Sequence, residues 1–377
     1  GKDGAAALLA AMLADHTRAH RHEAWAARLD AHALRFSASA GAEAWTFSIT
    51  ALAEEIPEAI AALAEAVQRP GWDAQRFRTL KARAIAAAEK AREDPVRVAD
   101  ELWRPALFGA HPYARLPGGA PETLRRVRLR DLKALYEAQF HPEGAVLAAA
   151  GAITLERLRP LVARAFHWRG APRLRLEDIP RPAPPKPARI VRRMPTTQTT
   201  ITFATLGVSR RDPMLFPAFV AVEMLGGGGF SSALMQALRE KHGLVYGAYA
   251  YLAPRARRAE LIVRLQTQNA KADEARALTK KILARFARGE FPDAAVEAAK
   301  TRLIGQFPQK IDSNRERAAL LAMVAFYDLG VDYLHNWQAR MRAVRPEDVR
   351  RAAKRLFAGP WIEADVGGGD AQDRARR

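Results

Sequence analysis

Cysteine is absent from the 377-residue chain. Its absence excludes disulfide bonds, thiolate-bound zinc and cysteine nucleophiles, and it is compatible with an oxidising or a reducing compartment. Long apolar runs are absent as well, because no stretch approaches the roughly 18 to 20 residues that a membrane-spanning helix needs. The first residues show no basic segment followed by an apolar segment and a cleavage site. We therefore expect no membrane span in this sequence.

Acidic residues are scarce relative to basic ones, with 41 Asp and Glu against 60 Lys and Arg, so the formal net charge is +19. Such a charge is compatible with binding to nucleic acid or to an acidic protein surface. The arginines, however, are scattered along helix-like segments such as "ETLRRVRLRDLKALYEAQF", where they alternate with apolar positions. These arginines are expected on solvated helix faces, and no motif supports a nucleic-acid partner.

The length of the chain favours two or more domains, each with its own apolar interior. Residues 174–188 concentrate prolines and charges, which is typical of an extended linker. We therefore predict an N-terminal domain at residues 1–173 and a C-terminal domain at residues 189–377. Residues 127–151 and 344–368 share a helix-like segment, a turn and a short apolar strand. This repetition predicts an internal duplication.

Helix-like and strand-like segments are mixed without strict alternation, which predicts an α+β protein. Strands are expected at residues 34–41 and 44–52, which form a hairpin, and at residues 196–207 and 259–268. Helices are expected at about residues 56–68, 73–92, 214–224, 271–288 and 292–306.

The most informative stretch is "LGGGGFSSALMQALREKHGLVYGAYAYL" at residues 225–252. It predicts a flexible glycine run, a helix that ends at Arg239, a turn at Gly243 and a strand that begins at Tyr246. The glycine run is not a phosphate-binding loop, because no Gly-Lys-Ser/Thr follows it and no G-x-G-x-x-G is present at a strand-to-helix junction.

This stretch resembles a segment of the pitrilysin/insulinase family of zinc metallopeptidases, whose C-terminal half carries a "G-F-S-S-x-L…L-R-E-K-x-G-L-x-Y" pattern. The resemblance continues through "EDPVRVADELWRPALFGAHPYARLPGG" and "DSNRERAALLAMVAFYDLG" over nearly the whole chain. It is to the short two-domain forms in particular, such as the alpha-type subunits of the mitochondrial processing peptidase and bacterial two-subunit relatives. The resemblance implies two similar α+β halves, each a mostly antiparallel sheet with helices packed on one face, that form half of a clamshell.

Catalytic members of this family carry H-x-x-E-H on a helix near the start of the chain, where two histidines bind zinc and the glutamate activates water. Laid on "GAAALLAAML", the two ligand positions fall on Ala7 and Ala11 and the base position falls on Ala10. The third ligand position, a glutamate further along the chain, falls on Ala87, with Glu89 two residues away as the alternative if the register is shifted. Alanine offers a metal no lone pair and cannot take a proton from water. We therefore expect no metal in this chain and no catalysis by it alone.

A second candidate metal site is "DHTRAHRHE", which holds Asp15, His16, His20, His22 and Glu23. His16 and His20 have the i,i+4 spacing of helical metal ligands. The family pattern, however, places this stretch in a loop after the helix, and polar loop histidines usually bind no metal. We predict no metal at this stretch.

The resemblance implies that the C-terminal half keeps a functional pair. Arg239 and Tyr246 match the arginine and tyrosine that lie across the cavity from the zinc and hydrogen-bond the substrate backbone. A guanidinium and a phenol are suitable donors to a carbonyl oxygen. The alternative is that Arg239 caps the end of its helix and Tyr246 is a packed strand residue.

A glycine-rich loop at a comparable place in the processing peptidase alpha subunit contributes to substrate capture. The resemblance therefore implies substrate contacts for Gly226, Gly227, Gly228, Gly229 and Phe230. The alternative is that the glycine run is a plain connector between helices.

These observations predict a non-catalytic, substrate-binding subunit of a heterodimeric zinc metallopeptidase. A homologous catalytic partner would bring H-x-x-E-H and zinc, and the substrate would be a peptide. The alternative is a structural homologue without peptidase work, like the core proteins of the respiratory bc complex. We expect a periplasmic location, with a cytoplasmic one as the alternative. Relatives have a few tens of residues before the zinc motif, so we also expect that the sequence is incomplete at its N-terminus.

Overall fold

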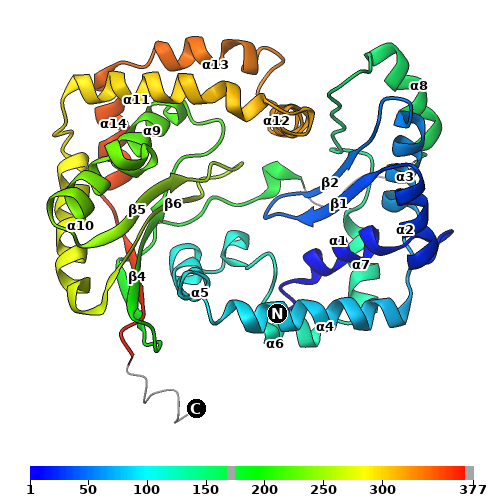
Figure 1. Ribbon diagram of the computed structural model, residues 1–377, viewed down its shortest axis with the longest axis horizontal. Helices are drawn as coiled ribbons and strands as arrows, with labels where there is room; N and C mark the ends of the chain where they lie inside the picture. Colours follow the sequence, from blue (N-terminus) through cyan, green and yellow to red (C-terminus); the bar gives the residue numbers. More distant parts are fainter. Residues whose placement is uncertain (168–174, 370–377) are drawn as a thin grey trace. The chain divides into compact units, whose positions relative to one another are not determined.

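The computed structural model of the chain describes residues 1–167 and 175–369 (Figure 1). The described residues divide into two compact units, each of which contains helices and a β-sheet. The N-terminal unit comprises residues 1–91, 115–178 and 311–326, and the C-terminal unit comprises residues 92–114, 179–310 and those from residue 327 onward. The prediction of an α+β protein is confirmed.

The N-terminal unit has a two-stranded antiparallel sheet with helices around it. Its strands and helices are α1 (Ala5–Asp15), α2 (His22–Ala31), β1 (Arg35–Ala40), β2 (Trp45–Thr50), α3 (Ile56–Gln68), α4 (Ala74–Ala91), α6 (Pro121–Arg126), α7 (Leu129–Gln139), α8 (Leu155–Ala165) and α12 (Asn314–Phe326). The predicted hairpin and the two predicted helices that follow it are confirmed as β1, β2, α3 and α4.

Helix α1 buries an apolar face in the centre of the N-terminal unit. Leu8, Leu9, Met12 and Leu13 recur at intervals of about one helical turn, so they lie on the same side of the helix. The buried cluster consists of Leu8, Leu9, Met12, Leu13, Phe77, Leu124, Val127 and Leu132. The alanine-rich start of the sequence therefore folds as a core helix, packed against residues of α4, α6 and α7.

The apolar strand predicted after Phe140 does not form. Residues 145–150 have no regular secondary structure, and Val146 and Leu147 are 39% and 40% exposed. The corresponding strand of the C-terminal unit has a neighbouring strand on each side, whereas no described strand pairs with residues 145–150. A strand needs a partner for its backbone N–H and C=O groups, so the apolar sequence alone does not produce one.

The C-terminal unit has a five-stranded sheet in the order β3-β7-β4-β6-β5. β3 and β7 are parallel, and the other neighbouring strands are antiparallel. The strands and helices of this unit are α5 (Pro95–Phe108), β3 (Ala188–Arg192), β4 (Gln198–Leu206), α9 (Leu215–Val222), a π-helical segment (Glu223–Gly227), a second π-helical segment (Met235–Lys241), β5 (Val245–Leu252), β6 (Glu260–Gln268), α10 (Ala272–Ala287), α11 (Asp293–Gln306), α13 (Tyr333–Arg342), α14 (Pro346–Phe357) and β7 (Ile362–Val366). The strands predicted at residues 196–207 and 259–268 are confirmed as β4 and β6.

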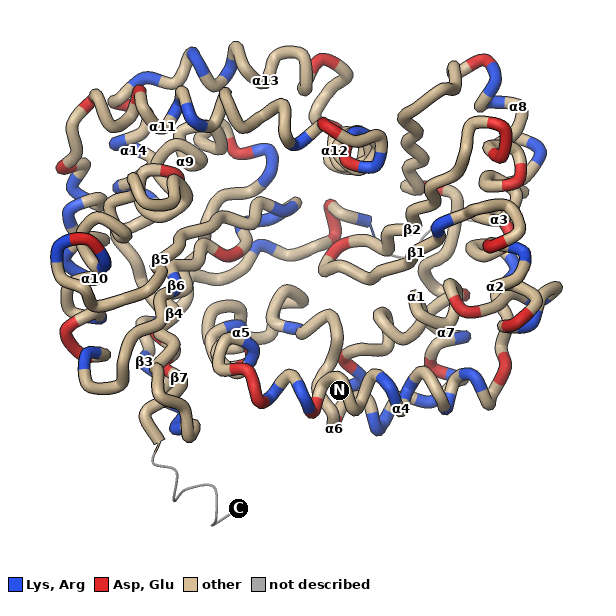
Figure 2. Tube along the Cα trace, in the orientation of Figure 1, with Lys and Arg blue, Asp and Glu red and all other residues tan. Residues whose placement is uncertain are grey.

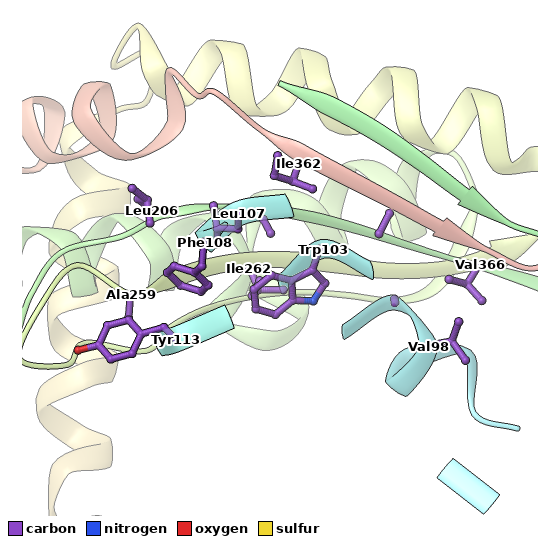
Figure 3. Packing of buried hydrophobic residues seen from close by; sticks show 13 residues of the cluster. Val98, Trp103, Leu107, Phe108, Tyr113, Leu206, Ala259, Ile262, Ile362 and Val366 are labelled. Carbon is purple, nitrogen blue, oxygen red and sulfur yellow. The ribbon is translucent and has the colours of Figure 1, made fainter. Parts of the chain in front are cut away.

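Helices cover both faces of this sheet. On one face Ile362, Ala364 and Val366 of β7 pack against α5, where Trp103 lies at the centre of the apolar cluster (Figure 3). Alternate residues of a strand point to opposite faces. Asp365 accordingly points to the other face, where its carboxylate lies 2.9 Å from the guanidinium of Arg276 on α10. The sheet is thus enclosed between α5 and α10.

Two segments belong to the other unit than the continuous domains predicted from the sequence would assign them to. Residues 92–114 belong to the C-terminal unit because α5 buries its apolar face on that unit's sheet, and residues 311–326 belong to the N-terminal unit. The chain passes between the units near residue 178, inside the predicted linker at residues 174–188. Leu174, the first residue of that linker, lies outside the described residues.

Lys and Arg positions are spread along the helices of both units (Figure 2). In the segment "ETLRRVRLRDLKALYEAQF", Arg125, Arg126, Arg128 and Arg130 are exposed, as expected from the sequence. Within residues 1–167 and 175–369, none of the helices combines the length and the apolar character that crossing a membrane requires.

Candidate functional site

The end of the second π-helical segment fixes the direction in which the chain enters β5. Gly243 has φ of +56°, its N–H donates to the carbonyl of Arg239 at 3.0 Å, and the N–H of Leu244 donates to the carbonyl of Leu238 at 2.7 Å. The bond from Gly243 is that of an αL C-cap motif, and the two bonds together satisfy carbonyls of the last helical turn with backbone groups. Backbone groups therefore cap the helix, and the side chain of Arg239 is not needed for that role.

A β-bulge at the start of β5 turns Tyr246 outward. Val245 lies opposite Thr267 and Gly247 lies opposite Gln266, so Tyr246 is the extra residue with no partner on β6. A bulge redirects one side chain at a strand end. The tyrosine is 79% exposed, although Val245 and Gly247 on either side of it are buried. Tyr246 is thus a surface side chain and not a packed strand residue.

The side chain of Arg239 is held between two aromatic rings. Its Cζ atom lies 4.7 Å from the centroid of the Phe230 ring and 5.0 Å from the centroid of the Tyr246 ring. Contacts of a guanidinium with the faces of two rings are favourable and orient its plane. The guanidinium also forms a long ion pair with Glu240, whose carboxylate oxygen lies 3.9 Å from Nε of Arg239. The structure thus brings together three predicted site residues, with a guanidinium and a phenol available as donors.

The four glycines of the run have different environments. A Cβ on Gly226 would lie 2.5 Å from the backbone nitrogen of Ala250 and 2.8 Å from its Cβ, so only glycine allows this close approach to β5. Gly227 and Gly228 lie beside the ion pair of Glu223 and Arg302. Gly229 is exposed, with φ of +58° and open space around it. Gly226 therefore has a packing role, whereas the predicted substrate contacts of all four remain predictions.

Two further tyrosines on β5 were not singled out in the sequence. Tyr249 and Tyr251 are 55% and 41% exposed and alternate with buried alanines, so they lie on one face of the strand. The ring of Tyr249 covers Gly247, because a Cβ on that glycine would lie 2.7 Å from the tyrosine hydroxyl. The spacing of the tyrosines in "VYGAYAYL" predicts that Tyr249 and Tyr251 share a face of the strand, but it does not predict which face of β5 is exposed to solvent.

The alanines at the predicted zinc positions are distributed over two helices of the N-terminal unit. Ala10 is buried in α1, and Ala7 and Ala11 are half-buried on the same helix. Ala87 is exposed on α4, whose side chains Ala84, Ile85 and Ala88 pack against the apolar cluster of α1. None of these side chains can ligate a metal. Within residues 1–167 and 175–369, no group of three or more His, Cys, Asp or Glu side chains is placed to hold a metal ion.

The histidine-rich stretch after α1 forms a hydrogen-bonded network. His16 is buried, with its Nδ1 atom 3.0 Å from the Asp15 carboxylate and its Nε2 atom accepting from the backbone N–H of Asp73 at 3.2 Å. The guanidinium of Arg76 donates to the Asp15 carboxylate at 2.8 Å and 2.5 Å. Burial opposes the ionisation of Asp15, but the hydrogen bonds from Arg76 and His16 outweigh it, so its pKa is lowered.

A second carboxylate anchors the remainder of this stretch. Glu65 of α3 accepts hydrogen bonds from the Thr17 hydroxyl at 2.5 Å and from the Arg28 guanidinium at 2.6 Å, and it lies 2.8 Å from Nδ1 of His20. Burial opposes ionisation, but these bonds dominate and lower the pKa of Glu65. The polar groups of this stretch therefore hydrogen-bond the end of α1 and the loop after it to α3 and α4.

Two family models match the chain. The model described as "Insulinase (Peptidase family M16)" matches residues 1–115, and the model described as "Peptidase M16 inactive domain" matches residues 126–303. The chain belongs to the M16 family. The resemblance to the pitrilysin/insulinase family, predicted from the motifs at residues 225–252, is thereby confirmed. The model for the inactive domain matches the part of the M16 chain that contains Arg239 and Tyr246.

Curated relatives of this M16 chain are zinc proteases. An uncharacterized zinc protease of Streptomyces coelicolor is 28% identical over 169 residues, which are 42% of this chain and 36% of the relative. One of Mycobacterium bovis is 24% identical over 281 residues, which are 73% of this chain and 63% of the relative. The matches thus span between one third and two thirds of the length of these relatives.

Solved structures share the fold of this M16 chain. A crystal structure of a "peptidase M16 inactive domain" from Pseudomonas fluorescens has a TM-score of 0.88 at 24% identity and covers 98% of this chain and 90% of its own. A protease from Helicobacter pylori has a TM-score of 0.84 at 16% identity, with 97% and 90% covered. The fold is therefore that of M16 proteins.

Proposed function

We propose that this M16 chain is the non-catalytic, substrate-binding subunit of a heterodimeric zinc metallopeptidase. Its partner would be a homologous catalytic chain with an intact H-x-x-E-H motif, which would hold the zinc. This chain would contribute Arg239 and Tyr246 to a composite site. The observation that carries the proposal is the position of the Arg239 guanidinium between the rings of Phe230 and Tyr246, beside a tyrosine that a bulge exposes.

The N-terminal unit supports the non-catalytic part of the proposal. Ala7, Ala10 and Ala11 lie on α1, where the catalytic members have two histidines and a glutamate. Without nitrogen or oxygen atoms in these side chains, the helix can neither bind zinc nor remove a proton from water. Peptide hydrolysis by this chain alone is therefore not expected.

The C-terminal unit supports the substrate-binding part. β5 is an end strand of the five-stranded sheet, so its outer edge has no neighbouring strand among the described residues. An extended peptide can add to such an edge through backbone hydrogen bonds, with its side chains alternating between the two faces. Tyr249 and Tyr251 would then contact substrate side chains on one face, while Arg239 and Tyr246 would donate to carbonyl groups near the start of the strand.

The net charge of +19 favours an acidic partner surface or acidic peptides in this scheme.

We also propose a periplasmic location, which rests on the lack of cysteine and on the frequent export of bacterial relatives. Fractionation of cells that express the full-length gene product tests the location independently of activity.

The experiment mixes this chain with a homologous chain from the same organism that carries H-x-x-E-H. Hydrolysis of a quenched fluorescent peptide and zinc content are measured for each chain alone and for the mixture. The proposal predicts activity in the mixture only, with zinc in the partner preparation only. Full activity of the partner alone would instead assign a structural or regulatory role to this chain.

Matched variants connect the result to the site. Arg239→Ala and Tyr246→Phe should lower the activity of the mixture without preventing association of the chains in gel filtration. Lys241→Gln is the control. Lys241 is exposed, and its substitution removes a positive charge from the same π-helical segment as Arg239→Ala does. Equal activity of the three variants would contradict the proposed roles of Arg239 and Tyr246.

A further inference from the structure

A cavity of about 920 Å³ lies in the C-terminal unit, lined by residues 210–217, by Asp328 and Leu329, and by residues of α13, α14 and the turn between these helices. Its lining is rich in charge, with five arginines and three aspartates among the residues that contact it. Such a cavity is a candidate ligand site when some of its polar groups have no partner within the protein. The pairing of these charged groups therefore decides what the cavity can bind.

Each of the three aspartates is paired with one of the arginines. The pairs are Asp212 with Arg355 at 2.8 Å, Asp328 with Arg211 at 2.9 Å, and Asp348 with Arg351. These six side chains neutralise one another. Arg210 and Arg340 remain, so the lining of the cavity has two positive charges in excess.

Arg210 and Arg340 make ring contacts in place of ion pairs. The Cζ atom of Arg210 lies 5.3 Å from the centroid of the Tyr327 ring, and that of Arg340 lies 5.6 Å from the centroid of the Tyr333 ring. Within the part of the chain that the structure describes, neither guanidinium has a carboxylate partner. The Nε atom of Arg210 is buried and has no hydrogen-bond partner. A buried guanidinium N–H without a partner is costly. The positive charges of Arg210 and Arg340 are therefore not compensated by a carboxylate of the described residues.

Tyr333 adds a third donor that has no partner. Its side chain lines the cavity and is only 5% exposed, yet its hydroxyl bonds to no group among residues 1–167 and 175–369. Burial raises the pKa of this hydroxyl, and the positive charges of Arg210 and Arg340 oppose the rise. The charges of Arg210 and Arg340 both act at this hydroxyl, and all three side chains line the same cavity.

We propose that this cavity binds a small oxyanion, a phosphate or carboxylate group, through Arg210, Arg340 and Tyr333. Guanidinium groups bind carboxylate and phosphate oxygens with paired N–H donors, and the phenol hydroxyl supplies one further bond. Two uncompensated positive charges match a ligand with up to two negative charges. A bound anion would compensate the two positive charges and accept a hydrogen bond from the hydroxyl of Tyr333, which has no protein partner in the described structure.

Isothermal titration calorimetry of the full chain with inorganic phosphate and, separately, with acetate and succinate tests this proposal. Sodium chloride holds the ionic strength constant, so that general screening of the +19 chain does not contribute. Saturable binding of one anion per chain is expected for phosphate or for a carboxylate, and the separate titrations distinguish the two groups. No saturable binding of any of the three anions would overturn the proposal.

Variants of α13 make the test specific. Arg340→Gln should weaken binding about tenfold or more, because it removes a charged donor, and Tyr333→Phe should weaken it by about fivefold. Arg342→Gln is the control: Arg342 is exposed on the same helix, donates to Gln338 and does not line the cavity. The control should bind as the wild type does. Equal weakening of anion binding by Arg340→Gln and Arg342→Gln would show a nonspecific effect of surface charge and contradict the site. Unchanged binding in both Arg340→Gln and Tyr333→Phe would also contradict it. No peptidase activity is needed for any of these measurements.

Discussion

The guanidinium carbon of Arg239 lies 5.0 Å from the ring centroid of Tyr246, although the two residues belong to different elements. Arg239 lies in the last turn of a π-helical segment that backbone bonds cap at Gly243, and Tyr246 is the bulged residue of β5. The turn and the bulge together point an arginine and a tyrosine side chain toward the same place. Their contact has no packing role in the apolar core, since Tyr246 is 79% exposed.

The close contact of Gly226 with β5 predicts a loss of stability when a methyl group is added. Gly226→Ala should lower the free energy of unfolding by about 1 to 3 kcal/mol, because the new Cβ meets the backbone of Ala250. Gly305→Ala is the matched control, since Gly305 lies in α11 with nothing within 4 Å of a Cβ. It should raise stability by about 0.5 to 1 kcal/mol through the better helix propensity of alanine. Urea unfolding measures both, and equal effects would contradict the packing role of Gly226.

The position of α5 in the C-terminal unit predicts the effect of truncating Trp103. This side chain is 1% exposed and packs against the sheet (Figure 3). Trp103→Ala should lower the free energy of unfolding by about 3 to 5 kcal/mol. Leu155→Ala, which truncates a side chain that is 62% exposed, should change it by less than about 0.5 kcal/mol. A small effect of Trp103→Ala in chemical denaturation would contradict the docking of α5 on this sheet.

The network around Asp15 predicts a dependence of stability on pH. The folded-state pKa of Asp15 is below its ordinary value of 3.8, so its ionised form stabilises the fold above that pH. The contribution is lost as the pH falls through the lowered folded-state pKa. Asp15→Asn should therefore be less stable than the wild type at pH 7, where Arg76 loses its buried partner, and the gap should close as the pH falls below about 4. A gap that stays constant between pH 7 and pH 3 in denaturant titrations would contradict this role of Asp15.

Much of the fold could be predicted from periodicity. The hairpin, the long helices and the two longest strands have clear patterns of apolar residues, and the structure contains them. The strand expected after Phe140 did not form, because pairing depends on a neighbour that local sequence does not reveal. That α5 belongs to the C-terminal unit also could not be predicted. Its apolar face packs on a sheet whose strands lie much further along the chain, and no pattern within residues 95–108 indicates that sheet.

The candidate site could be predicted only in part. Arg239 and Tyr246 were predicted from the resemblance of residues 225–252 to the family motif, and the structure brings the two side chains into contact. The bulge that exposes Tyr246 is set by the pairing of β5 with β6, which a single sequence does not show. The cavity at Arg210 and Arg340 was not predicted, since it combines residues from three separate segments whose charges pair only in the folded unit.

The rate of peptide hydrolysis by the mixture of this chain with its H-x-x-E-H partner tests the central claim most directly. Arg239→Ala should reduce kcat/KM of the mixture by about 100-fold or more, because a charged donor to the reacting carbonyl is lost. Tyr246→Phe, which keeps the ring over the guanidinium and removes only the hydroxyl, should reduce it by about tenfold. Lys241→Gln should leave it unchanged. Wild-type kcat/KM in both site variants, with the chains still associated, would contradict the composite site.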